Sequence, residues 1–313
     1  MIRPRDVARL WNRFFFEPIS TVPIALYRIV FGLTVLADGL IMARDLTEFF
    51  GTRGMLSPES AALVTPGLRV NLAGVLPAGD TWLYLFFAAY LVSALCLTLG
   101  FRTRTAAVAV WLGLVSLHHR NPLILNSGDT LLRIAAFWLM FAPAGRALSL
   151  DSWPHRGAAP KAAPWAQRMI QIQISVLYAT TVWLKLSGPD WIDGTALYWV
   201  SRLPEFARFP VPYVFDHMWT IRALTWGTLA VELGLASLVW VRRLRPWVLL
   251  AGVALHLGID WSMALALMQW VMIGAYAVFL EEEHVRRPGR ALLSAERWIA
   301  SVRMRRAGHV AAE

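Results

Sequence analysis

A long apolar run near the N-terminus decides the fold class: residues 22–43 read VPIALYRIVFGLTVLADGLIMA. Only two of its side chains, Arg28 and Asp38, are charged. A helix needs about 17–25 mostly apolar residues to cross a bilayer, and this run has that length. It therefore predicts a membrane-spanning helix. No small-residue cleavage site follows it, so we expect the helix to stay in the chain.

The rest of the chain has the composition of a membrane protein. Of its 313 residues, 57% are hydrophobic and only 16% are charged, whereas about a quarter are charged in soluble domains. Many of the 16 tryptophans lie near the ends of apolar runs, where their rings favour the headgroup layer. The net charge of +10 indicates basic loops facing anionic lipid rather than nucleic acid. Cys96 is the single cysteine, which excludes an intrachain disulfide.

Seven further apolar runs are each bounded by charged residues or prolines. Together with the first they predict an all-α fold, a polytopic bundle of about eight transmembrane helices. The clearest runs are 22–43, 81–100, 219–239 and 263–280, and the shorter or more polar ones are 104–119, 129–144, 165–186 and 245–260.

The basic residues predict how this bundle is oriented. With eight spans and the N-terminus inside, twenty of the thirty Lys and Arg residues fall in inside segments and seven in outside loops. Such an excess of basic residues on one side is typical of cytoplasmic loops. We therefore expect a multi-pass protein of the cell inner (plasma) membrane with both termini in the cytoplasm.

Both chain ends are predicted to lie on the membrane surface as amphipathic helices. Apolar side chains recur at helical spacing in 5–16 and again in 290–306, with arginines between them. Disorder is the alternative for the second segment. The chain thus divides into a cytoplasmic amphipathic segment 1–21, a transmembrane domain 22–280 and a basic cytoplasmic tail 281–313.

Charged groups within the predicted spans are candidates for function because they are costly to bury in lipid. Most lie in the outer half of the membrane, and we expect them to surround one pocket that opens outward. Purely structural roles are the alternative: an Asp129–Arg133 ion pair, a His256 hydrogen bond between helices, a Glu232–Gln269 contact, and Arg28 as a helix-end contact. His118 and His119 are expected to be loop residues. The six that would share the pocket are Asp38, Asp129, Arg133, Lys185, His256 and Asp260.

Lys185 is the hardest of these residues to explain structurally. The Gly188-Pro189 pair after it must end the helix, and an external loop containing Asp190 and Trp191 follows. Burial among apolar groups favours a neutral amine, which can act as a base, whereas a neighbouring carboxylate favours the charged form. Sequence alone leaves both outcomes open.

Four short segments resemble the HTTM family, the transmembrane domain that bacterial membrane proteins share with vitamin K-dependent gamma-glutamyl carboxylase. The resemblance covers about residues 20–282, so the transmembrane domain is expected to be HTTM-like. The segments are 26–33 with Asp38, 126–133, Lys185-Leu186 with Asp190-Trp191 and Gly194, and 256–259.

The resemblance implies that Lys185 corresponds to the carboxylase lysine that deprotonates reduced vitamin K and so starts oxygenation to an epoxide. The chain departs from the carboxylase in three ways. It has one extra residue before Asp190-Trp191. It has a glycine, Gly128, at or beside the position where the carboxylase has a functional histidine. It also lacks the large lumenal domain of the carboxylase. Some bacterial relatives are linked instead to maturation of secreted peptide toxins.

These patterns lead to three functional hypotheses. The first is a carboxylase-like or quinol-dependent oxygenase or epoxidase, with Lys185, Asp129 and His256 as catalytic residues and a reduced quinone of the vitamin K or menaquinol type. The second is a maturation partner for an exported peptide without redox chemistry, and the third a transporter. No nucleotide, metal or protease motif is present. The expected pocket residues are Asp38, Asn126, Arg133, Asp190, Trp191 and Asp260.

Overall fold

The computed structural model describes residues 3–64, 70–75, 77, 79–154, 160–209 and 213–285. These residues are predominantly helical, with one two-stranded antiparallel pair, β1 (Ile19–Ser20) with β2 (Lys161–Ala162). The helices are α1 (Pro4–Phe16), α2 (Val22–Met42), α3 (Leu46–Phe50), α4 (Pro58–Val64), α5 (Asp80–Leu99), α6 (Thr103–Arg120), α7 (Ser127–Leu139), α8 (Trp165–Leu186), α9 (Pro189–Ile192), α10 (Ala196–Val200), α11 (Met218–Ala236), α12 (Arg245–Ser262) and α13 (Met268–Ala275).

Each of the eight apolar runs contains a helix, which confirms the all-α class. Three segments are long and apolar enough to cross a membrane: Val22–Phe50, Asp80–Leu99 and Trp165–Leu186. That all eight helices cross it stays a prediction. Two runs are shorter than predicted. α7 ends at Leu139, shortly before Pro143, because a proline disfavours helix in the residue preceding it. The last run becomes helical only at Met268.

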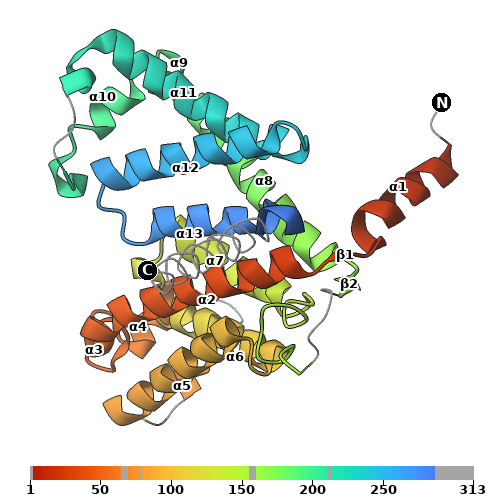
Figure 1. Ribbon diagram of the computed structural model, residues 1–313. Helices are drawn as coiled ribbons and strands as arrows, with labels where there is room; N and C mark the ends of the chain where they lie inside the picture. The colour runs from red at the N-terminus through yellow and green to blue at the C-terminus, as the bar shows by residue number, and fades with distance from the viewer. Residues whose placement is uncertain are drawn as a thin grey trace, which may run out of the picture.

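The helices pack as neighbours along much of the chain (Figure 1). α2 packs against α5, which packs against α6, and α6 packs against α7. On the other side of the bundle, α8 packs against α11, which packs against α12. α13 lies between these halves, because it contacts α2 and α7 as well as α12. Side chains from both halves therefore reach toward α13.

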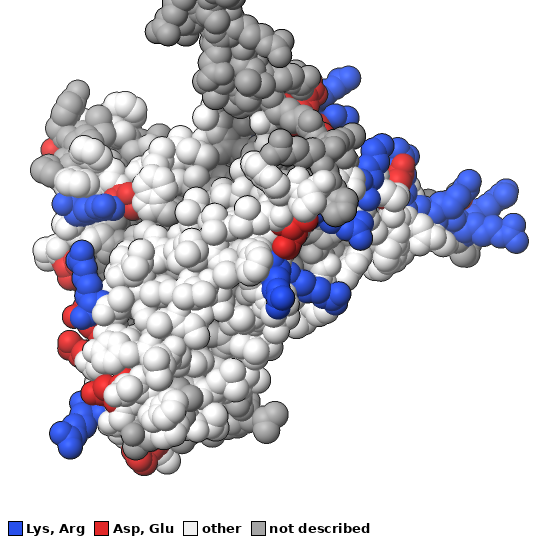
Figure 2. All heavy atoms as spheres, turned by 60° about the horizontal axis from the view of Figure 1, so that its bottom comes forward, with Lys and Arg blue, Asp and Glu red and all other residues white. Residues whose placement is uncertain are grey.

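Large apolar side chains cover the outside of the long helices. Val92 on α5 is 59% exposed and Trp183 on α8 is 73% exposed. Charged side chains gather toward two ends of the molecule, and a broad uncharged surface separates them in Figure 2. Such a surface is unfavourable in water and favourable in the hydrocarbon core of a bilayer. The protein is therefore embedded in a membrane.

The two ends of the bundle have different structures. We call the end that carries α1, β1 and β2 the α1 end, and the end that carries α3, α4, α9 and α10 the loop end (Figure 1). α1 extends away from the helices, with Leu10 62% exposed. The predicted N-terminal amphipathic helix is thus present, whereas segment 290–306 lies outside the described residues.

Arg28 holds the α1 end together. Its side chain is fully buried on α2 and donates to the carbonyl oxygens of Ala144 (3.0 Å), Leu148 (2.5 Å) and Thr98 (3.4 Å). Gly100, with φ of +70°, lies against the guanidinium, and a Cβ there would lie 2.3 Å from Nη1. Arg28 therefore has the structural role expected from the sequence.

Asp151 stabilises the start of α6 at the same end. Its carboxylate accepts hydrogen bonds from the backbone N–H groups of Arg102 and Thr103, both at 2.8 Å, and from the Thr103 hydroxyl at 2.7 Å. Slight burial raises the pKa of Asp151, but these hydrogen bonds and the charge of Arg28 lower that pKa more, so it lies below its usual value. The ionised carboxylate is the form that caps the helix.

Candidate functional site

Lys185 forms an ion pair with Glu232 at the loop end of the bundle. Lys185 lies in the last turn of α8, and its Nζ contacts Glu232 Oε1 on the neighbouring helix α11. The Glu232 side chain is only 9% exposed and that of Lys185 23% exposed. Thr181, one turn earlier on α8, lies 3.5 Å from the other carboxylate oxygen. The pair is therefore buried on the Glu232 side and open to the surface at Lys185.

The break after α8 brings an aromatic ring to this lysine. The helix ends at Leu186, as the Gly188-Pro189 pair predicts, and α9 begins at Pro189. The resulting turn places Lys185 Nζ 4.8 Å from the centre of the Trp191 ring. The Trp226 indole donates to the Ile192 carbonyl at 3.2 Å and so ties this turn to α11. Lys185 thus has a carboxylate on one side and an indole ring on another.

His256 belongs to a hydrogen-bonded chain of four buried side chains. His256 Nδ1 lies 2.5 Å from Gln269 Oε1, and Nε2 lies 2.7 Å from the Tyr178 hydroxyl, which is 2.6 Å from the Tyr276 hydroxyl. Gln269 Oε1 can only accept, so Nδ1 carries the proton and Nε2 of the neutral ring accepts. Tyr178 must then donate to His256, and Tyr276 must donate to Tyr178. Each hydroxyl in this hydrogen-bonded chain therefore donates in the direction of His256.

The ion pair and the chain form one polar region. Tyr178, Thr181 and Lys185 follow one another at helical spacing on α8, so the chain and the ion pair lie along one face of this helix. We call this set the Lys185 group. Its members are Thr181, Lys185, Trp191 and Glu232 with Tyr178, His256, Gln269 and Tyr276. Its chemical capacity is acid–base: a paired amine and carboxylate beside an imidazole with a defined tautomer.

A second set of polar side chains, which we call the Asp38 group, lies between α2, α5, α6 and α7. The charge of Asp129 acts on Asp38, both carboxylates act on Tyr90, and Arg133 acts on His118. Four buried atoms here have no hydrogen-bond partner among the described residues: Asp38 Oδ2, the Tyr90 hydroxyl and both His118 ring nitrogens. Tyr90 and His118 are each 3% exposed. The Asp38 group consists of Asp38, Tyr90, His118, Asp129 and Arg133.

Asp129 and Asn126 build the start of α7. The Asn126 side chain accepts from the backbone N–H of Gly128 at 2.7 Å, and Asp129 Oδ2 accepts from the Asn126 N–H at 2.7 Å. This reciprocal arrangement is a capping box, which stabilises a helix N-terminus. Within the described residues Asp129 makes no ion pair with Arg133. The structural role of Asp129 is therefore to cap α7 and not to pair with Arg133.

The remaining predicted pocket residues lie apart from these contacts. Asp260 on α12 pairs at 2.9 Å with Arg208, which lies in the segment between α10 and α11. Asp190 is exposed and accepts from the Thr195 hydroxyl at 3.2 Å. The structure thus joins Lys185, Trp191 and His256 in one group and Asp38, Asp129 and Arg133 in the other.

Gly128 marks the contact between the two halves of the bundle. A Cβ at this position would lie 3.3 Å from the Met268 Cα on α13 and 2.9 Å from Asn126 Oδ1. A Cβ here would make a tight contact with α13, so the glycine allows the close approach of α7 and α13. The glycine that stands at or beside the carboxylase histidine therefore has a packing role in this chain.

Several functional candidates were misread from the sequence. A Glu232–Gln269 contact was one alternative, but Glu232 pairs with Lys185, while Gln269 pairs with His256. His118 and His119 were expected in a loop, but both lie in the last turn of α6. Tyr178, Tyr276 and Tyr90 gave no signal, because a tyrosine in an apolar run is usually taken as part of the core.

The exposed part of Lys185 has aromatic and apolar neighbours. The part of the lysine that reaches the surface lies beside Trp191, and neighbouring Leu184 and Ile192 are 64% and 60% exposed. An indole can stack on a ring and the ion pair can meet its hydroxyl. Among the described residues, no group of three or more His, Cys, Asp or Glu side chains is placed to hold a metal ion.

Comparison with known proteins agrees with the resemblance found in the sequence. A family model described as the HTTM domain matches residues 16–284. The chain is similar to "Uncharacterized protein YitO" of Bacillus subtilis (strain 168), at 21% identity over 252 residues, which covers 72% of this chain and 76% of the relative. No solved structure matches. The chain therefore belongs to the HTTM domain family and is a membrane protein related to the transmembrane domain of vitamin K-dependent gamma-glutamyl carboxylase.

Proposed function

We propose that this protein is a membrane enzyme in which the Lys185–Glu232 pair is the general base. Its substrate would be a reduced quinone of the vitamin K or menaquinol type. The observation that carries the proposal is the ion pair itself, buried at Glu232 and open to the surface at Lys185. This arrangement places a proton acceptor within reach of a molecule that enters from the bilayer.

The pair can accept a proton although the lysine contacts a carboxylate. The Glu232 side chain is largely buried, and a low-polarity environment penalises separated charges. Transfer of the lysine proton to Glu232 gives a neutral amine and a neutral carboxyl group. The amine then takes the substrate proton, so the pair as a whole gains one proton. Lys185 and Glu232 would thus act as one unit.

His256 would assist as a second acid–base group. Its neutral tautomer is held by Gln269, and its other partner, Tyr178, lies on the same helix as Lys185. A hydrogen-bonded chain that is directed toward an imidazole can hold or move a proton at Nε2. Asp129, also expected to be catalytic, caps α7, and we assign it to binding or helix stability rather than to proton transfer.

A bound reduced quinone would supply an acidic ring hydroxyl and a ring that can be oxidised by oxygen. Trp191 would orient the ring, and Lys185 would take the hydroxyl proton. The proposal excludes glutamate carboxylation, because this chain has Gly128 at or beside the position of the carboxylase histidine.

The proposed orientation places the loop end, and therefore Lys185, outside the cell. It requires eight membrane crossings in the inner membrane with both termini in the cytoplasm. Reporter fusions after residues 60, 125, 205 and 262 should all report an outside location. A cytoplasmic signal at two of these positions would contradict the orientation.

Protection of Lys185 from an amine reagent tests binding of the quinone at this site. The chain has only two lysines, and Lys161 lies on β2 at the opposite end. In purified protein, a menaquinol analogue should slow acylation of Lys185 and leave Lys161 unchanged, as measured by peptide mass spectrometry. Equal labelling of Lys185 with and without the analogue would contradict the proposal.

A maturation partner for an exported peptide is the second candidate. Exposed aromatic side chains favour it, since Trp199 is 58% exposed, Phe209 45% and Trp261 54%, all at or near the loop end. Such side chains can contact an apolar peptide segment. This function needs no proton acceptor, so Lys185→Gln would leave it intact, whereas the enzyme would be inactivated.

A further inference from the structure

The α1 end contains a cavity of about 800 Å³ that the proposed chemistry does not use. It lies between α1, the start of α8, the α11–α12 turn and the segment after α13. Its walls combine the apolar side chains of Leu10, Phe14 and Ile19 with several arginines and glutamates. The cavity therefore has an apolar part and a charged part.

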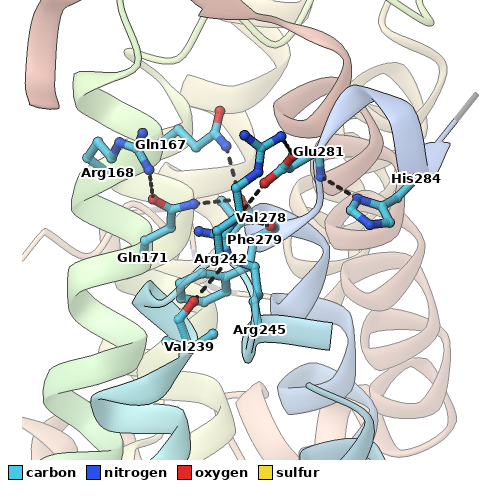
Figure 3. A network of polar contacts seen from close by, with 10 residues as sticks. All are labelled: Gln167, Arg168, Gln171, Val239, Arg242, Arg245, Val278, Phe279, Glu281 and His284. Carbon is cyan, nitrogen blue, oxygen red and sulfur yellow. Dashed lines mark hydrogen bonds and ion pairs between the residues drawn. The ribbon is translucent and has the colours of Figure 1, made fainter. Parts of the chain in front are cut away.

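A network of fixed polar groups forms the charged part (Figure 3). Gln167 and Gln171 on α8 both donate to the Val278 carbonyl, at 2.9 and 2.8 Å. Gln171 Oε1 accepts from Arg168 at 2.9 Å. On the other side, Arg245 donates to the Val239 carbonyl at 3.0 Å. The two arginines are thus held in place by neutral groups from both sides.

The arginines are only partly neutralised by carboxylates. Glu281 is shared by Arg242 (2.5 Å) and Arg245 (3.0 Å). None of the described residues gives Arg168 a carboxylate partner. It contacts the Phe14 carbonyl at 3.3 Å and lies 4.8 Å from the centre of the Phe14 ring. Arg168 and Arg245 both line the cavity. An anion between them would neutralise charge that the carboxylates leave unpaired.

We propose that this cavity binds the phosphate headgroup of an anionic phospholipid between Arg168 and Arg245. A guanidinium offers paired N–H donors that match phosphate oxygens, and basic pockets between membrane helices are suited to lipid headgroups. The exposed apolar face of α1 would lie in the same headgroup layer, with Leu10 and Phe14 beside the glycerol and the start of the acyl chains. α1 would thus cover the bound headgroup.

Lipid-dependent stability of the full-length protein tests this site. In detergent, phosphatidylglycerol should raise Tm, phosphatidylcholine should have little effect, and native mass spectrometry should detect bound phosphatidylglycerol. Arg168→Gln should weaken phosphatidylglycerol binding roughly tenfold or more, since it removes a charge-assisted hydrogen bond. Arg243→Gln is the matched control, because Arg243 is exposed and does not line the cavity.

A second variant avoids the packed helices. Leu10→Glu places a carboxylate at the cavity wall on α1, which extends away from the bundle, and should weaken binding by repulsion without unfolding the protein. Equal stabilisation of wild type, R168Q and L10E by phosphatidylglycerol would overturn the proposal. Stabilisation by inorganic phosphate as large as that by phosphatidylglycerol would overturn the lipid assignment.

Discussion

The Lys185 group and the Asp38 group differ in whether their buried polar atoms have hydrogen-bond partners. In the Lys185 group, the amine, the imidazole and both tyrosine hydroxyls have partners. In the Asp38 group, Tyr90 and His118 are just as deeply buried but have no hydrogen-bond partner among the described residues. A buried polar atom without a partner costs about 1–3 kcal/mol. The first group therefore stabilises the fold, whereas the second has hydrogen-bonding capacity that the described protein groups do not use.

This difference indicates different roles for the two groups. A complete set of partners holds side chains in one geometry, which acid–base chemistry needs. Unmet hydrogen-bonding capacity instead suits a region that receives a polar ligand. Substitutions that remove single polar atoms should therefore have opposite effects in the two groups, and the following predictions run from the largest effect to the smallest.

Removal of the Glu232 carboxylate should have the largest effect on stability. Glu232→Ala leaves Lys185 without its partner and should lower the free energy of unfolding by up to about 3 kcal/mol, the low end for buried pairs because Lys185 is partly exposed. Unfolding of the purified protein in mixed micelles would measure this. Lys185→Met combined with E232A should restore part of the loss, and simple additivity of the two substitutions would argue against a coupled pair.

Removal of the Tyr178 hydroxyl should have the second largest effect on stability. Tyr178→Phe deletes the group that joins His256 to Tyr276, so the His256 Nε2 acceptor loses its donor. We expect a loss of about 2 kcal/mol in the free energy of unfolding. An unchanged unfolding curve would mean that the chain does not stabilise the bundle.

Removal of the Asp151 carboxylate should have a smaller effect on stability. This carboxylate lies outside the membrane helices and has hydrogen-bond partners. Asp151→Asn should cost about 1 kcal/mol, as for the loss of a helix cap at an exposed site. Because folding lowers the pKa of Asp151, its contribution is full above the pKa of the unfolded chain and is lost as the pH falls through the folded-state pKa. Wild type and D151N should thus differ in Tm at neutral pH and converge in acid. A difference that persisted in acid would contradict the assignment.

Removal of the Tyr90 hydroxyl should have the smallest effect and the opposite sign. Tyr90→Phe removes a buried hydroxyl that has no partner, so stability should be unchanged or higher by up to about 1 kcal/mol. The substitution keeps the aromatic ring because the ring packs closely on Gly113, where a Cβ would lie only 2.3 Å from it. The pair Y178F and Y90F deletes the same atom in both groups, and equal effects would remove the distinction between them.

Sequence alone predicted the helices better than the contacts between them. Apolar runs and the Gly188-Pro189 break located α2, α5 and the end of α8, because length and backbone constraints act locally. The pairing of Lys185 with Glu232 depends on how α8 and α11 rotate against one another, which no local pattern encodes. The same holds for Tyr178, whose role appears only when α12 and the turn after α13 bring His256 and Tyr276 to it.

A double-mutant cycle on reduced-quinone oxidation tests the central claim most directly. With purified protein, oxygen and vitamin K hydroquinone, Lys185→Gln and Glu232→Gln should each lower the rate constant by about 10²–10⁴, the usual contribution of a general base. Because the pair accepts one proton as a unit, the double variant should be about as slow as either single variant. Lys161→Gln, at the opposite end of the bundle, should keep the wild-type rate. A K185Q variant as fast as wild type, or effects that multiply in the double variant, would contradict the account.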